Sequence, residues 1–117
     1  MLEKSIENEN AAFLLKQCGF YASSVNRSYY SVYQHILSLY EPDKDETDAE
    51  GSHIKTINGF CRTFSDFKFR TMLISEIQEL KKLRKQADYE EKSINDKQAE
   101  AAFKKCQSIK QKIEVNK

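Results

Sequence analysis

Apolar residues recur at helical spacing in five stretches of the chain, and the second stretch has the most regular pattern. Val25, Tyr29, Val32, Ile36 and Tyr40 follow one another at intervals of four, three, four and four residues. These intervals place the five side chains on one face of an α-helix. Because neither Gly nor Pro occurs from position 20 to 41, about twenty residues can form one helix roughly 30 Å long. The pattern predicts a central helix around which the other segments pack.

Amphipathic patterns on both sides of this stretch predict a first and a third helix. The first runs from Leu2 or Glu3 to Cys18, and Gly19 is a natural C-terminal stop. Its expected inner face consists of Ile6, Ala11, Phe13, Leu14, Leu15 and Cys18. An acidic loop from Glu41 to Gly51 separates the central helix from the third, which Ser52 is expected to cap. The inward residues of the third helix are expected to be Ile54, Ile57, Phe60 or Cys61, and Phe64.

The last two predicted helices have well-defined apolar faces. The fourth follows a short connection in which Phe67 and Phe69 would close one end of the bundle, and it ends near Tyr89. Its inward residues are Leu73, Ile77, Leu80 and Leu83. The fifth, capped by Asn95 or Asp96, directs inward Ala99, Ala102, Phe103, Cys106, Ile109 and Ile113. The sequence therefore predicts an all-α protein, an up-and-down bundle of four to five helices in a single domain spanning residues 1–117.

Composition excludes several classes of protein. With 3 Gly and 1 Pro in 117 residues, the chain lacks the turn residues of a β-sandwich or barrel. A net charge of +1 gives no reason to expect nonspecific binding to nucleic acid or to a membrane. Cys18, Cys61 and Cys106 are too far apart in sequence for a metal-binding motif and are interpreted as free thiols. Since neither a signal peptide nor a membrane-spanning run is recognised, a cytoplasmic protein is expected. Because no Cys/His spacing for a metal is found, neither a metal nor a cofactor is expected.

Three polar residues interrupt the apolar stripes: Arg27, His53 and Arg84. Asp88 lies four residues after Arg84 on the same helix face, and it could pair with Arg84 or reach Arg27 across the bundle. These groups, with hydroxyls from Tyr29, Tyr30 and Tyr89, could form a polar layer that fixes helix register. Alternatively, two Arg and a His could line a cleft that binds phosphate. His35 is interpreted as an ordinary helix residue.

The sequence contains few signals of enzyme chemistry. It has no Gly-rich phosphate loop, no GxSxG or HExxH motif, and no Glu/His set at di-iron spacing. His53 is the one candidate for a general acid or base.

Three segments in order carry a resemblance to a known superfamily: Asn26-Arg27-Ser28-Tyr29-Tyr30-Ser31-Val32-Tyr33, then Gly51-Ser52-His53-Ile54-Lys55-Thr56-Ile57-Asn58-Gly59-Phe60, then Leu83-Arg84-Lys85-Gln86-Ala87-Asp88-Tyr89. The chain resembles the HEPN domain superfamily, in particular its prokaryotic branch with a YYA-type helix and an R-x-x-A-D-Y ending. The resemblance implies a helical bundle, frequently a homodimer, paired with a minimal nucleotidyltransferase-type partner in toxin–antitoxin or defence operons. It also implies that active members cleave RNA without a metal, using an Arg followed about four to six residues later by a His.

This chain departs from that pattern, because the position five residues after Arg84 is Tyr89 and no His follows nearby. Tyrosine, with a pKa near 10, is a poor proton shuttle at neutral pH. The leading hypothesis is therefore a non-catalytic HEPN-like module that binds a nucleotide, RNA or a partner protein. Its expected site consists of Arg27, Tyr30, His53, Arg84, Asp88 and Tyr89. The alternatives are a metal-independent ribonuclease using Arg84 with His53 or Tyr89, and a purely structural, self-associating bundle.

Overall fold

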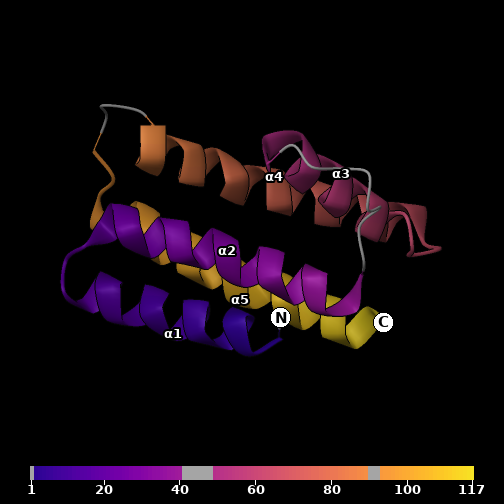
Figure 1. Ribbon diagram of the computed structural model, residues 1–117, viewed down its shortest axis with the longest axis horizontal. Helices are drawn as coiled ribbons and strands as arrows, with labels where there is room; N and C mark the ends of the chain where they lie inside the picture. The colour runs from indigo at the N-terminus through magenta and orange to yellow at the C-terminus, as the bar shows by residue number, and fades with distance from the viewer. Residues whose placement is uncertain (1, 41–48, 90–92) are drawn as a thin grey trace.

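One central helix, α2 (Tyr21–Leu39), contacts the other four helices of the structure (Figure 1). This computed structural model describes residues 2–40, 49–89 and 93–117. For residues 49–52, at the start of the third helix, it describes the backbone alone. The other helices are α1 (Leu2–Gln17), α3 (Ala49–Cys61), α4 (Phe67–Tyr89) and α5 (Asp96–Asn116). Within the described ranges there is no strand, so the prediction of an all-α helical bundle is confirmed. In Figure 1, α1 lies on one side of α2 and α3 and α4 lie on the other. α5 runs behind α2, where it contacts α1, α2 and α4.

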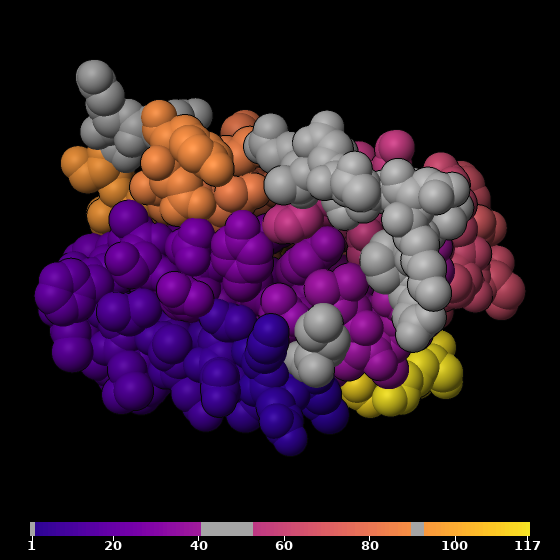
Figure 2. Space-filling model, in the orientation of Figure 1, coloured from indigo at the N-terminus to yellow at the C-terminus, as the bar shows by residue number. Residues whose placement is uncertain are grey.

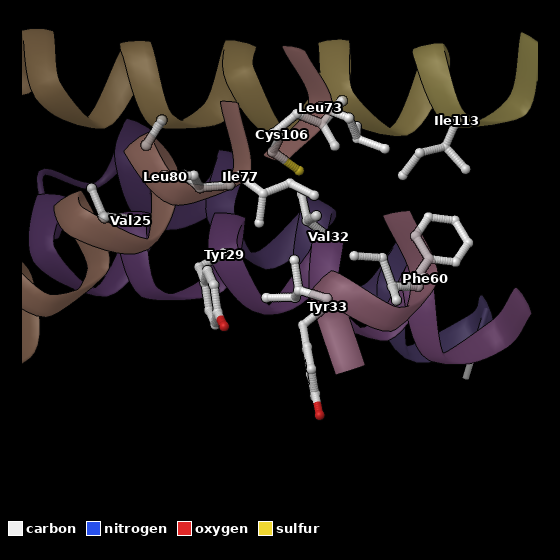
Figure 3. Close-up of a cluster of buried hydrophobic side chains, with 14 of the residues drawn as sticks. Val25, Tyr29, Val32, Tyr33, Phe60, Leu73, Ile77, Leu80, Cys106 and Ile113 are labelled. Carbon is white, nitrogen blue, oxygen red and sulfur yellow. The ribbon is translucent and has the colours of Figure 1, made fainter. Parts of the chain in front are cut away.

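The core forms along the predicted stripe of α2. Val25, Tyr29, Val32 and Ile36 are at most 1 % exposed. They pack against Leu73, Ile77 and Leu80 of α4 and against Ala99, Ala102, Cys106, Ile109 and Ile113 of α5. Figure 3 shows these groups from three helices meeting in one cluster, with the rings of Tyr29 and Tyr33 pointing away from α5. The inward faces predicted for the central and last helices are confirmed.

The turn between α1 and α2 depends on Gly19. Its φ of +82° lies in the left-handed region, which a residue without Cβ adopts at little cost. The amide of Phe20 donates to the Leu15 carbonyl and that of Gly19 to the Lys16 carbonyl, which is the hydrogen-bond pattern of a Schellman motif. Gly19 therefore ends α1 as predicted and sends α2 back along it.

The inner face predicted for α1 is wrong. Ile6, Phe13 and Leu14 are 51 %, 42 % and 62 % exposed, and the two buried residues of α1 are Ser5 and Ala12. Small side chains let the two helix backbones approach closely. In that seam the Ser5 hydroxyl donates to the Ser31 carbonyl and the Ser31 hydroxyl to the Ser5 carbonyl, each at 2.7 Å. Hydrogen bonding between small residues, rather than burial of large apolar ones, determines which face of α1 is inside.

Of the predictions for the ends of the other helices, some are confirmed and some are wrong. α3 begins at Ala49, so the Ser52 cap is wrong, and most of the predicted acidic loop lies outside the described residues. Phe67 is 73 % exposed and closes nothing, whereas Phe69 packs on Phe64. Asn95 caps α5 with a capping box, in which its side chain accepts from the Gln98 amide at 2.8 Å.

Candidate functional site

Arg84 is buried among aromatic rings near the C-terminal end of α4. The residue is 3 % exposed. Its guanidinium carbon lies 5.0 Å from the ring centre of Tyr29 and 5.8 Å from those of Tyr30 and Tyr89. Cations within about 6 Å of a ring face are attracted by its quadrupole. Because α4 crosses α2 at this level, the paired tyrosines of α2 provide that surface.

Asp88 joins Arg84 to α2. Arg84 Nη1 donates to Asp88 Oδ2 at 3.4 Å, and Asn26 Nδ2 donates to the same oxygen at 3.0 Å. Asp88 therefore pairs with Arg84 and not with Arg27, the other arginine that the sequence offers. Arg27 instead donates from Nη1 to Asn8 Oδ1 of α1 at 3.2 Å.

The Arg84 guanidinium remains charged in this environment. Burial lowers its pKa, but the neighbouring Tyr30 and Tyr29 and hydrogen bonds to Asp88 and Tyr89 raise it more, so the pKa lies above its ordinary value. A permanent cation here holds the Asp88 carboxylate in place and orients the surrounding rings.

His53 belongs to the same aromatic cluster, which it enters from α3. Its Nδ1 lies 3.2 Å from the Tyr29 hydroxyl, and its ring is stacked on Tyr33 with 4.0 Å between ring centres. The edge of Tyr30 also meets the His53 ring, at a centre-to-centre distance of 5.9 Å. His53 and Arg84 therefore share Tyr29 and Tyr30, although they come from different helices.

A shallow groove opens beside this cluster, between the N-terminal half of α2 and the last turn of α4. Arg27 and Asn26 line one side, Asp88 and Tyr89 the other, and the small Ala22 and Ser23 leave the floor open to a volume of about 500 Å³. Tyr89 is 71 % exposed, and Arg27 is exposed as well. Figure 2 shows the end of α4, in orange, lying directly over α2, in purple.

The structure thus brings together Tyr30, His53, Arg84, Asp88 and Tyr89, and it places Arg27 across the groove from Asp88 and Tyr89. Sequence reasoning missed two further members, Asn26 and Tyr33. Both lie on the face of Tyr29 and Tyr30, because positions 26, 29, 30 and 33 are separated by three, one and three residues. That spacing could have identified them.

Comparison of the chain with protein-family models, with curated proteins and with solved structures finds no match. Across the described residues, no group of three or more His, Cys, Asp or Glu side chains is arranged to hold a metal ion. In the same residues, no helix is both long and apolar enough to cross a bilayer. The function must therefore be argued from the geometry of the site.

His35 differs from the ordinary helix residue expected from its neighbours. It is 3 % exposed in the interface of α2 with α5, and its Nε2 lies 2.9 Å from Glu114 Oε1. Burial lowers the pKa of His35 below its usual 6.5, Glu114 raises it, and Lys110 and Lys117 lower it. The net direction is downward, so the folded protein prefers the neutral ring.

This burial predicts a pH dependence of stability. The unfolded chain protonates His35 more readily than the folded protein does. The stability that neutral, buried His35 contributes is therefore present above about pH 6.5 and is lost as pH falls toward the lower pKa of the folded state. The free energy of unfolding, measured in urea, should decline from pH 7 downward, and His35→Gln should remove that part of the slope. Glu114→Gln should steepen it, since Glu114 raises the pKa. An unchanged slope in His35→Gln would contradict the prediction. Glu79, Glu100 and Glu114, whose pKa values are lowered by hydrogen bonds to lysines, act only at lower pH.

Proposed function

We propose that the protein is a non-catalytic, HEPN-like binding module that takes a nucleotide or single-stranded RNA in the groove between α2 and α4. The observation that carries the proposal is the pairing of two exposed groups, Arg27 and Tyr89, on opposite sides of one groove. An exposed guanidinium suits a phosphate, and an exposed aromatic ring suits a base. Asp88 and Asn26, which are hydrogen-bonded to each other, also line the groove and add polar atoms to it.

Arg84 has a positioning role in this proposal. Its side chain is buried, it already donates to Asp88, and it lies against Tyr89 and Tyr30. A phosphate in the groove would meet Arg27 first. The two arginines therefore have different roles: Arg27 binds the phosphate, and Arg84 does not contact it but holds Asp88 in place at the side of the groove.

The resemblance to HEPN domains supplies the biological setting of the proposal. The three motif segments, distant in sequence, contribute to one cluster through Tyr29, His53 and Arg84. From the resemblance, the proposal takes a cytoplasmic role in a toxin–antitoxin or defence system, a minimal nucleotidyltransferase-type protein as partner, and self-association as a homodimer.

The second candidate is the metal-independent ribonuclease. The sharing of Tyr29 by Arg84 and His53 favours it, because it brings a cation and a proton carrier to one ring. Arg84 would stabilise the phosphate in the transition state, and His53 or Tyr89 would move the proton. Arg84 would first have to leave its buried contacts with Asp88 and the tyrosines.

Binding of a short, fluorescein-labelled single-stranded RNA, followed by anisotropy, tests the proposal. Arg27→Ala and Tyr89→Ala should each weaken binding about tenfold, as expected for loss of one phosphate contact or one stacked base. Arg27→Ala should also reduce the slope of log affinity against log salt concentration by about 0.7. The exposed Arg62 of the loop after α3 provides the matched control, and Arg62→Ala should change neither quantity.

A gel of the same RNA separates the two candidates. Intact RNA with saturable, Arg27-dependent binding supports the binding module. Cleavage by the wild type that is lost in a folded His53→Gln protein would replace the module with the ribonuclease. RNA that is neither bound nor cut, together with no binding of AMP, would contradict both.

A further inference from the structure

A second groove, between α3 and α4, has a different chemistry from the first. It has a volume of about 360 Å³, an aliphatic wall of Ile54, Ile57 and Ile77, and a basic rim of Lys81, Lys82 and Lys85. Ile57 and Ile77 are 5 % and 1 % exposed and belong to the core, whereas Ile54 is 46 % exposed. The sequence pattern predicts Ile54 inside, and the structure places it at the edge of this groove. An aliphatic surface here continues outward from the core.

The basic rim arises because α4 separates its charges. Glu76 and Glu79 lie on the side of α4 that faces α5, where they pair with Lys112 and Lys105. The third described acid of α4, Asp88, pairs with Arg84. Each of these carboxylates therefore pairs with a cation outside the second groove.

The lysines of the rim lie on the opposite side of α4, facing α3, since positions 81 and 85 are one helical turn apart and 82 is adjacent. Among the residues that the structure describes, Lys82 and Lys85 have no ion-pair partner. On α3 the described side chains of the groove are Ile and Asn, which add no negative charge. The groove thus combines an aliphatic wall with a local excess of positive charge.

We propose that this groove docks an acidic, amphipathic helical segment of a partner protein. The aliphatic face of such a segment would cover Ile54 and the edges of Ile57 and Ile77, and its carboxylates would meet Lys82 and Lys85. Helices with one apolar face commonly bind in grooves of this kind, with anchors spaced by three and four residues. Opposite charge at the rim accelerates the encounter and fixes the orientation.

Two features of the groove favour a peptide over other anions. Among the described residues that line it there is no aromatic ring, so a nucleic-acid base would find no stacking surface on them. The aliphatic wall is recessed between two helices, where a flat lipid surface makes little contact. The groove also lies on the α3 side of α4, apart from Arg27 and Tyr89, so this proposal stands independently of the one for RNA.

The test uses a labelled synthetic peptide of about four helical turns, with Leu along one face and Glu along the other. The full-length protein should bind it saturably by anisotropy, and rising salt should weaken the complex. Lys82→Glu/Lys85→Glu should weaken binding more than tenfold, and Ile54→Ser should weaken it severalfold. Both changes affect exposed positions, so far-UV circular dichroism and melting should match those of the wild type.

The control variant is Lys97→Glu/Lys104→Glu on α5, which makes the same change in net charge on another exposed face. It should leave the affinity unchanged, as should Arg27→Ala. Equal losses in both double variants, or equal binding of a peptide in which Ser replaces Leu, would overturn the proposal by showing that charge alone drives the association. Absence of saturable binding would overturn it too. So would stronger Lys82- and Lys85-dependent binding of RNA or of anionic phosphatidylserine vesicles.

Discussion

Replacement of Arg84 by alanine should lower the free energy of unfolding by about 3 kcal/mol and the melting temperature by roughly 10 °C. The change removes a buried cation that lies against Tyr29, Tyr30 and Tyr89, and it leaves a cavity among their rings. It also leaves Asp88, whose side chain is 24 % exposed, with the amide of Asn26 as its hydrogen-bond donor across the helices. Denaturation in urea, followed by circular dichroism, measures the loss.

Two matched variants separate packing from charge. Arg84→Met fills much of the same volume without a charge, so it should cost less than Arg84→Ala because it leaves a smaller cavity. The loss that remains in Arg84→Met measures the removal of the cation from Asp88. Arg62→Ala, at an exposed position, should have little effect. If Arg84→Met restores stability and RNA binding is also retained, the polar layer only sets helix register. An Arg84→Ala protein as stable as the wild type would contradict the structural role altogether.

Replacement of Ala12 by leucine should separate α1 from α2. Ala12 is 0 % exposed, and its carbonyl accepts a hydrogen bond from the Ser24 hydroxyl at 2.7 Å. A larger side chain at this closely packed position forces the backbones apart, at an expected cost of about 2 to 3 kcal/mol. Amide hydrogen exchange should become faster across α1 than across α4 and α5, because α1 packs mainly against α2.

Ala101→Leu on α5 is the control for this prediction. It makes the same substitution in a helix at an exposed position, so helix propensity changes equally while packing does not. Slower or unchanged exchange in α1 of the Ala12→Leu protein would show that the seam has room for leucine and would contradict the close-packing argument.

The contrast between α1 and the other helices shows what sequence patterns can predict here. In α2, α4 and α5 the apolar side chains that recur at helical spacing face inward, so spacing alone identifies Val25, Leu80 and Ile109 as core. α1 packs through Ser5 and Ala12 against serines of α2. Since hydrophobicity gives such small residues little weight, the pattern selects the wrong face.

In the candidate site, too, some contacts could be predicted from the sequence and others could not. The pairing of Arg84 with Asp88 could be foreseen, because it depends on a spacing of four within one helix. The bonds of Asn26 to Asp88 and of Arg27 to Asn8 cross between helices. They depend on how far one helix is rotated against the next, and no local pattern encodes that rotation. His35 was missed for the same reason, since its burial depends on the approach of α5.

The central position of α2 has a consequence for the order in which the protein can fold during synthesis. α1 and α2 adjoin in sequence and can pair early, but α5, which covers another side of α2, is translated after all the other helices. Until α5 arrives, the apolar stripe from Val25 to Ile36 lacks one of its covering layers on the nascent chain. The early pair of helices would therefore be the species most exposed to chaperones, and translation through α5 would supply the helix that covers this part of α2.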